Sequence, residues 1–290
     1  MSKTGKIVAI LLRILLAALF FMSSVAKLMA IDDFELYIFS FGIFSLNVSY
    51  IVARLCISVE FLIGLFIAIG WWKHLVNNIT LAVLFFFCVF LCYAALIGRT
   101  DSCQCMGRLV DLNPAQSLLK NAVLIVMVLL YDRRCPNEER GTRAWRIALT
   151  GVFSVGIVGA VFCLSVPDNW MFGPDESRYN KSLLEELIAT DGLLAADSLT
   201  QGNHLVAFVT PGCPYCKMSR QKITSIAQRN HLDSNRIHYY EPSDIGDTLF
   251  LRITFGQRPF IVMLEEGRPD VTYHYRNINE RQICRALRQN

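Results

Sequence analysis

Two cysteines three positions apart, Cys213 and Cys216, are the residues of this sequence best suited to chemistry. They enclose a Pro-Tyr pair and lie between an apolar, β-prone run at 204–210 and a polar run at 217–223 typical of the start of a helix. A helix amino end carries partial positive charge and free N–H groups, which favour a thiolate at Cys213. Cys216, one turn further on, can resolve a mixed disulfide. The spacing therefore predicts a dithiol exchange site, with a structural zinc or a static disulfide as the alternatives.

About forty residues later, Arg258 and Pro259 precede the apolar run 260–264, which predicts a strand opened by a proline. The cysteine pair followed by this strand resembles the thioredoxin superfamily over roughly residues 181–290, and the Pro-Tyr pair resembles glutaredoxins more than thioredoxin. The resemblance implies that Cys213 attacks, that Cys216 resolves, and that Pro259 is a cis-proline shaping the substrate groove. The buried acid that thioredoxin has six residues before its first cysteine is Ala207 here.

The composition indicates that much of the chain resides in a membrane. Of its 290 residues, 53% are hydrophobic and 18% charged, whereas soluble domains carry about 25% charged residues. Nearly all long apolar runs fall within residues 1–165, and 166–290 have the composition of an ordinary polar domain. The net charge of +4 is small and lies mostly between apolar runs, so it indicates membrane topology rather than nucleic-acid binding.

Five apolar segments approach the roughly 20 residues that a bilayer requires. We expect them at about 7–29, 51–70, 79–98, 114–131 and 145–166. The first could instead be a signal peptide, because lysines precede it and Leu28-Met29-Ala30 resembles a cleavage site. Its apolar run exceeds the usual core of about 7–15 residues, which favours a spanning helix. An interfacial helix is predicted in the loop 31–50.

The placement of lysine and arginine predicts the orientation of these spans. Basic residues precede the first span, five arginines fall within 132–146, and the loop 31–50 has no Lys or Arg. The positive-inside rule places the N-terminus in the cytoplasm and residues 167–290 outside. The loop 99–113 falls on the same oxidising side. We therefore predict a multi-pass protein of the cytoplasmic (inner) membrane.

A membrane domain is expected over 1–166, a linker over 167–180, and a periplasmic or otherwise extracytoplasmic domain over 181–290. The predicted elements of the last domain, in chain order, are a helix at about 181–199, a strand, the active-site helix, a strand near 237–240, a helix, strands at about 260–265 and 271–275, and a helix after Asn279.

Cys103 and Cys105, in the loop 99–113, form a second candidate pair. A disulfide between cysteines one residue apart closes a small, strained ring, and strained disulfides are easily reduced. Such a bond suits an electron relay better than a structural staple. Each cysteine could instead pair elsewhere, for instance with Cys163.

Among the charged residues in the predicted spans are Lys27, Arg54, Glu60 and Lys120. Because charges are costly in a bilayer, such groups usually face one another or a cavity. We expect all four in the outer half of the membrane, in a polar pocket that polarises a quinone carbonyl, supplies protons or stabilises a thiolate. The alternative is that both lysines snorkel to the surface and that Arg54 and Glu60 form a plain ion pair.

Residues 7–131 resemble the MauE/DoxX-like membrane family, whose members carry a Cys-Gly-Cys-Phe-Gly type motif where this chain has Cys103-Gln104-Cys105-Met106-Gly107. Further matching positions are Ser24, Lys27, Arg54, Glu60, Lys120 and Asn121. The resemblance implies a four-helix membrane unit connected with disulfide formation or quinone-linked sulfur oxidation. The expected fold class is thus an α-helical membrane bundle, namely this unit plus a fifth transmembrane helix, followed by an α/β thioredoxin-like domain.

Together these features predict a membrane thiol–disulfide oxidoreductase. Cys213 and Cys216 would exchange disulfides with extracytoplasmic proteins and pass electrons to Cys103 and Cys105, and these to a quinone of the membrane pool. Tethering raises the local concentration of a partner, typically to the millimolar range. We expect no metal, no covalently bound cofactor and no nucleic-acid partner.

Two alternatives stay open. Electrons could run outward, through intramembrane cysteines such as Cys88 and Cys92, and keep extracytoplasmic thiols reduced. The membrane unit could instead be a redox-inert anchor for a chaperone-like thioredoxin domain.

Overall fold

The computed structural model describes residues 3–97, 113–134, 142–167, 178–190 and 199–288. Contacts divide the chain into two compact units. One comprises Met1–Tyr37 with Tyr50–Ser165, and the other Ile38–Ser49 with Val166–Asn290.

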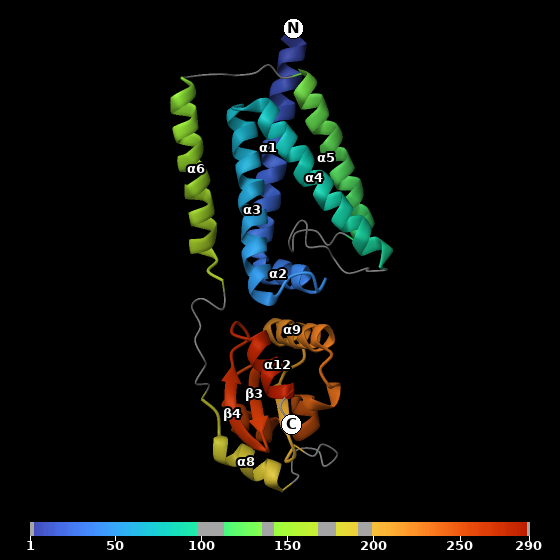
Figure 1. Ribbon diagram of the computed structural model, residues 1–290, viewed down its shortest axis with the longest axis vertical. Coiled ribbons are helices and arrows are strands. Elements are labelled where there is room, and N and C mark those ends of the chain that lie inside the picture. Colours follow the sequence, from blue (N-terminus) through green and yellow to red (C-terminus); the bar gives the residue numbers. More distant parts are fainter. Residues whose placement is uncertain (1–2, 98–112, 135–141, 168–177, 191–198, 289–290) are drawn as a thin grey trace. The chain divides into compact units, whose positions relative to one another are not determined.

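Long apolar helices make up the first part of the chain (Figure 1). Their bounds are α1 (Lys3–Met29), α2 (Ile31–Phe39), α3 (Leu46–Ile69), α4 (Lys73–Leu96), α5 (Pro114–Arg134) and α6 (Arg143–Leu164). All of these except α2 are long and apolar enough to cross a membrane, which confirms the five expected spans. The short α2 is the helix expected in the loop 31–50.

Several spans extend beyond their predicted bounds because polar residues continue the helix. The clearest case is α4, which begins at Lys73 rather than near residue 79. Lys73 Nζ donates to the Asp132 carbonyl oxygen at 2.5 Å, and Asn77 Nδ2 donates to the Asp132 carboxylate at 2.8 Å. These bonds hold the polar first turns of α4 against the last turn of α5. Hydropathy alone does not detect such a pairing.

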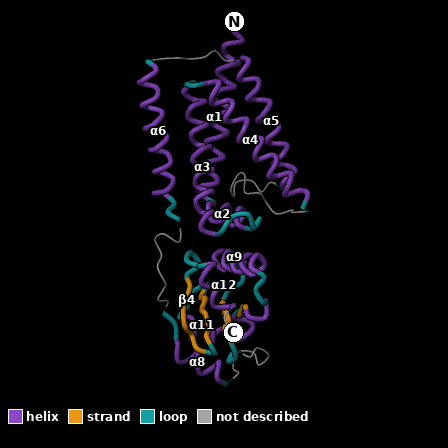
Figure 2. The backbone as a smooth tube through the Cα atoms, in the orientation of Figure 1, coloured by secondary structure: helices purple, strands orange, loops and turns teal. Residues whose placement is uncertain are grey.

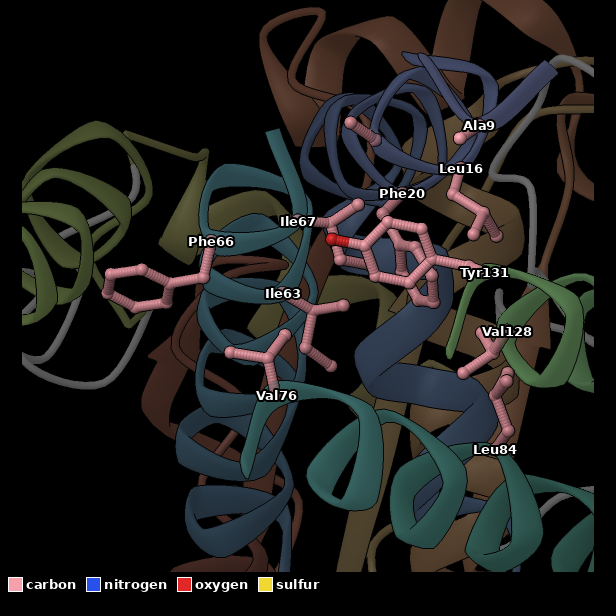
Figure 3. Close-up of a cluster of buried hydrophobic side chains, with 11 residues drawn as sticks. Ala9, Leu16, Phe20, Ile63, Phe66, Ile67, Val76, Leu84, Val128 and Tyr131 are labelled. Carbon is pink, nitrogen blue, oxygen red and sulfur yellow. The ribbon is translucent and has the colours of Figure 1, made fainter. Parts of the chain in front are cut away.

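An apolar core joins α1, α3, α4 and α5. Figure 3 shows its side chains, which include Leu16 and Phe20 of α1, Ile63 of α3, Leu84 of α4 and Val128 of α5. Many other large apolar side chains on these helices are exposed. Almost none of the most apolar stretch of α6 is buried. Extensive apolar exposure is unfavourable in water and expected for helices that face lipid.

Arg13, which interrupts the first apolar run, is accommodated by a helix end. Its guanidinium donates to the carbonyl oxygens of Ile67 at 2.9 Å and Ala68 at 2.7 Å. These carbonyls belong to the last turn of α3, where unpaired C=O groups carry partial negative charge. Arg13 of α1 therefore provides hydrogen-bond donors to the last carbonyl oxygens of α3.

The second unit contains a four-stranded mixed sheet, and Figure 2 shows strands in this part of the chain only, among the described residues. Its strands, in the spatial order β2-β1-β3-β4, are β2 (Ile237–Tyr240), β1 (Asn203–Phe208), β3 (Phe260–Glu265) and β4 (Arg268–Tyr273). β1 pairs in parallel with β2 and antiparallel with β3, and β3 pairs antiparallel with β4. The predicted strands 237–240 and 260–265 are confirmed.

Helices surround this sheet: α8 (Lys181–Ala189), α9 (Pro214–Asn230), α10 (Pro242–Ile245), α11 (Asp247–Thr254) and α12 (Glu280–Arg288). The helix predicted at 181–199 ends at Ala189, and residues 191–198 lie outside the described ranges. The last strand runs from Arg268 to Tyr273 rather than 271–275, because the turn at Glu266 and Gly267, both with positive φ, starts it early.

All six residues of β1 are buried, as expected for a central strand covered on both faces. Phe208 belongs to the apolar core of this unit, with its ring centroid 5.7 Å from Tyr240, 5.9 Å from Phe250 and 5.6 Å from Phe260. Leucines and isoleucines of α8 and α11 complete this cluster.

Replacing Phe208 by Ala should lower the free energy of unfolding of the C-terminal unit by about 3–5 kcal/mol, because a buried aromatic side chain leaves a cavity. Protease resistance of the full chain in increasing urea would measure it. Phe255→Ala, at a side chain 62% exposed, is the control and should change little. Equal losses in both variants would contradict this assignment of the core.

Candidate functional site

The cysteine pair lies at the amino end of α9. Cys213 is the N-cap residue and Pro214 the first helical residue, so the helix begins before position 217, where the sequence predicted its start. Proline suits this place because its missing N–H would have no partner there. Cys216 N–H donates to Cys213 Sγ at 3.3 Å. The Cys213 sulfur thus occupies the position of a helix-capping acceptor, where negative charge is favoured.

Cys216 lies behind Cys213. Cys213 is half-buried, whereas Cys216 is only 3% exposed. Burial first, and then the hydrogen bond with Cys213, raise the pKa of the Cys216 thiol to about 12, against the opposing effects of the Thr210 N–H and the charge of Arg258. Cys216 is therefore a thiol at neutral pH, and it must lose a proton before it can attack a disulfide.

Ala207 stands where the thioredoxin resemblance would place a buried acid, and its side chain brings no carboxylate to the site. Ala207 is fully buried in β1, where it pairs with Tyr239 and Ile261. Two other polar groups lie close to Cys216. Thr210 N–H donates to its sulfur at 3.5 Å, and Ser219 is buried one helical turn further along α9. Neither is a base of ordinary strength. The hydrogen bond from Thr210 N–H is the main influence that favours the Cys216 thiolate, and the charge of Arg258 adds to it.

An aromatic loop after β4 borders the site, and sequence reasoning missed it. The ring of Tyr215, which is 43% exposed between the two cysteines, lies 4.5 Å from that of Tyr275. The Tyr275 carbonyl accepts from the buried Lys222 at 3.4 Å. The Arg258–Pro259 peptide bond is cis, as the thioredoxin resemblance implied. Only the aromatic character of Tyr275 hinted at its place.

The raised pKa of Cys216 can be tested by alkylation. In a Cys213→Ser variant, the rate at Cys216 should be low at pH 7 and rise only above pH 9, because burial still raises the pKa of this thiol and only the thiolate reacts. Mass spectrometry with iodoacetamide would separate Cys216 from the other thiols.

The same protein unfolded in urea is the control. There Cys216 should titrate near its ordinary pKa of 9.0. A midpoint near 9 in the folded protein as well would contradict the buried thiol.

Two of the four predicted charged membrane residues pair with each other. Lys27 Nζ lies 2.6 Å from Glu60 Oε1 and 2.7 Å from Oε2, and it also donates to Ser23 Oγ at 2.9 Å. Ser23 in turn donates to Glu60 Oε2 at 3.2 Å. The side chains of Lys27 and Glu60 are only 2% and 7% exposed, so snorkelling is wrong for Lys27.

This cluster borders a cavity of about 490 Å³ between α1, α3, α4 and α5. Lys120 also lines it, so three of the four predicted residues come together. Its other polar lining residues are Ser23, Gln116 and Asn121. α3 begins at Leu46 rather than near residue 51, so Glu60 lies past its midpoint. This differs from the expectation that Glu60 lies in the outer half of the membrane, where the predicted orientation places the start of this helix.

Arg54 does not line the cavity, so its predicted place in the pocket is wrong, and so is the alternative of a plain Arg54–Glu60 ion pair. Its guanidinium forms an ion pair with Glu35 of α2, and donates to the carbonyl oxygens of Tyr50 at 2.7 Å and Ser165 at 2.5 Å. Arg54 and Glu35 are both almost completely buried. Arg54 therefore links α2 and α3 to the end of α6. Sequence reasoning missed Glu35 because it was assigned to the loop 31–50.

Replacing Arg54 by Met should destabilise the membrane unit by about 3–5 kcal/mol, since it removes the ion-pair partner of the buried Glu35. The thermal unfolding midpoint in detergent would report the loss. Adding Glu35→Gln should restore much of it, because the double variant has no unpaired charge. A double variant no more stable than Arg54→Met would contradict this account.

The second cysteine pair, Cys103 and Cys105, lies outside the described residues. The cysteines that the structure does describe are free, namely Cys56, Cys88, Cys92, Cys163, Cys213, Cys216 and Cys284. Within the described ranges, no three His, Cys, Asp or Glu side chains form a group that could hold a metal ion.

Known proteins match this chain over part of its length. No solved structure matches the chain. A curated protein described as Protein TlpB, from Flavobacterium psychrophilum, is 22% identical over 265 residues, covering 76% of this chain and 72% of the relative. Residues 5–131 match the family model described as methylamine utilisation protein MauE. The chain is thus a multi-pass membrane protein whose first four spans are similar to the MauE family.

Proposed function

We propose that this chain is a membrane thiol–disulfide oxidoreductase whose C-terminal unit is a thioredoxin-like domain. The observation that carries the proposal is the pair at the amino end of α9: Cys213 as N-cap acceptor and Cys216 as a buried thiol behind it. The order of elements supports it, because α9 connects the parallel strands β1 and β2, and the antiparallel pair β3 and β4 follows. Pro259 opens β3, as the resemblance expects.

The proposed reaction with a substrate dithiol starts from the Cys213–Cys216 disulfide. A substrate thiolate attacks Cys213 Sγ and displaces Cys216, which takes up a proton because its pKa is high. A second substrate thiolate then attacks the substrate sulfur of the mixed disulfide and releases Cys213. The substrate gains one disulfide, and the two cysteines gain two electrons.

Reoxidation proceeds, in this proposal, through Cys103 and Cys105. Two successive exchanges return the Cys213–Cys216 disulfide and leave Cys103 and Cys105 reduced. A quinone of the membrane pool is the proposed final acceptor. The substrates are thiols and disulfides of extracytoplasmic proteins. The arginines in the last turn of α5 support a cytoplasmic N-terminus and an outer C-terminal unit in the inner membrane.

The test is the redox state of Cys213 and Cys216 in cells, trapped with an alkylating reagent, with and without Cys103→Ser. We expect oxidised cysteines in the parent and reduced cysteines in the variant, because the relay is broken.

Cys284→Ser, at a half-buried thiol of α12, is the matched control and should match the parent. Reduced cysteines in the parent that become oxidised in Cys103→Ser would replace the oxidase with a reductase. No change in Cys103→Ser would favour a redox-inert anchor.

A further inference from the structure

The cavity beside Lys27 and Glu60 joins an apolar chamber to a buried, charged end. Most of its lining is apolar and comes from α1, α4 and α5, including Phe20, Phe87 and Leu124. Its volume of about 490 Å³ is within the usual range for small-molecule sites. A chamber of this kind accepts a ligand with an apolar body and a few polar atoms at one end.

The polar end is rich in hydrogen-bond donors. Lys27, Lys120, Gln116 and Asn121 all line the cavity, and Glu60 is the one carboxylate among the described lining residues. A matching ligand therefore presents acceptor oxygens. Because Leu119 and Val123 line the cavity and are 68% and 52% exposed, the chamber borders the apolar outer surface of α5. A ligand dissolved in the bilayer can reach it from there.

Structural needs alone do not explain the Lys27–Glu60 pair. Removing two charges from water costs more than their attraction usually returns, so a buried ion pair is weak evidence for stability. Ionisable groups within a membrane commonly mark a ligand or proton pathway. Lys27 and Glu60 share a network with Ser23, and both line the open chamber. The pair is thus placed to exchange a proton with a ligand atom.

We propose that this cavity binds the ring of a membrane quinone, and that Lys27 and Glu60 deliver protons to its carbonyl oxygen. The proposal rests on the proposed function for its source of electrons. Lys27 Nζ donates a proton at the carbonyl oxygen and regains one through Glu60. Lys120 donates a hydrogen bond to the ligand from α5.

The step balances without a further reactant. Oxidation of the two thiols Cys103 and Cys105 to a disulfide releases two electrons and two protons. Reduction of one quinone to a hydroquinone consumes both electrons and both protons. Glu60 would take up protons for the hydroquinone and pass them to Lys27, which keeps the number of protons equal on both sides.

Binding can be tested by titrating the purified full chain in detergent with a short-chain menaquinone analogue and measuring the heat of binding by calorimetry. Val123→Trp places a large ring in the chamber and should raise the dissociation constant at least tenfold. Val126→Trp is the matched control, because Val126 lies on the same helix, is 55% exposed and does not line the cavity. It should bind within about twofold of the parent. Equal binding by both variants would overturn the site.

The chemical class is tested by competition. Palmitate that displaces the analogue at equal concentration would overturn the assignment to a quinone, because the cavity would then select an apolar chain with any acceptor group. Failure to displace it at tenfold excess supports the assignment.

The proton role needs a variant that keeps the fold. Lys27→Met together with Glu60→Gln leaves no unpaired buried charge, and its thermal unfolding midpoint should stay near that of the parent. We expect the analogue to bind this double variant at least tenfold more weakly. Parent-like binding would remove both residues from the site.

One control separates this proposal from the function that it rests on. Exchange between Cys213 and a soluble disulfide needs no quinone, so Val123→Trp should retain it. If Val123→Trp keeps disulfide exchange and still binds the quinone analogue like the parent, the cavity proposal alone is wrong. If the parent shows no disulfide exchange, the proposed function is wrong.

Discussion

The parallel pairing of β1 with β2 is the constraint on which the cysteine site depends. Parallel neighbours need a crossover connection, and α9 supplies it. The helix must therefore begin close to the end of β1, the central and completely buried strand. Cys213 thus combines a free helix end with a rigid support, while Cys216 is buried on its inner side. The crossover between β1 and β2 thus places Cys213 at an accessible helix end and buries Cys216.

Buried ion pairs organise the membrane unit in a comparable way. Lys27 with Glu60 joins α1 to α3, and Arg54 with Glu35 joins α3 to α2. The two pairs differ in their surroundings. Arg54 also donates to the carbonyl oxygens of Tyr50 and Ser165 and does not line the cavity, which makes it a structural link between helices. Lys27 and Glu60 face a chamber with further donors from α5. Similar charges in similar helices thus have different capacities for chemistry.

The sequence predicted the five spans, the strands at 237–240 and 260–265, and the CxxC pair, because each depends on local pattern. It did not predict which charges meet. Arg54 and Glu60 are six residues apart on α3, which points them in different directions, and their partners lie on other helices. Tyr275 was missed for the same reason, since only the fold brings the loop after β4 to Tyr215. Contacts between distant segments depend on tertiary packing.

The pairing of Lys27 with Glu60 also limits how this protein can enter a membrane. α1 leaves the ribosome before α3, so Lys27 is synthesised while its carboxylate partner does not yet exist. A lone ammonium is costly in lipid. The first span must therefore stay at the translocation site, or keep Lys27 near the headgroups, until α3 arrives. Lys27 can therefore take its buried position beside Glu60 only after α3 has been made.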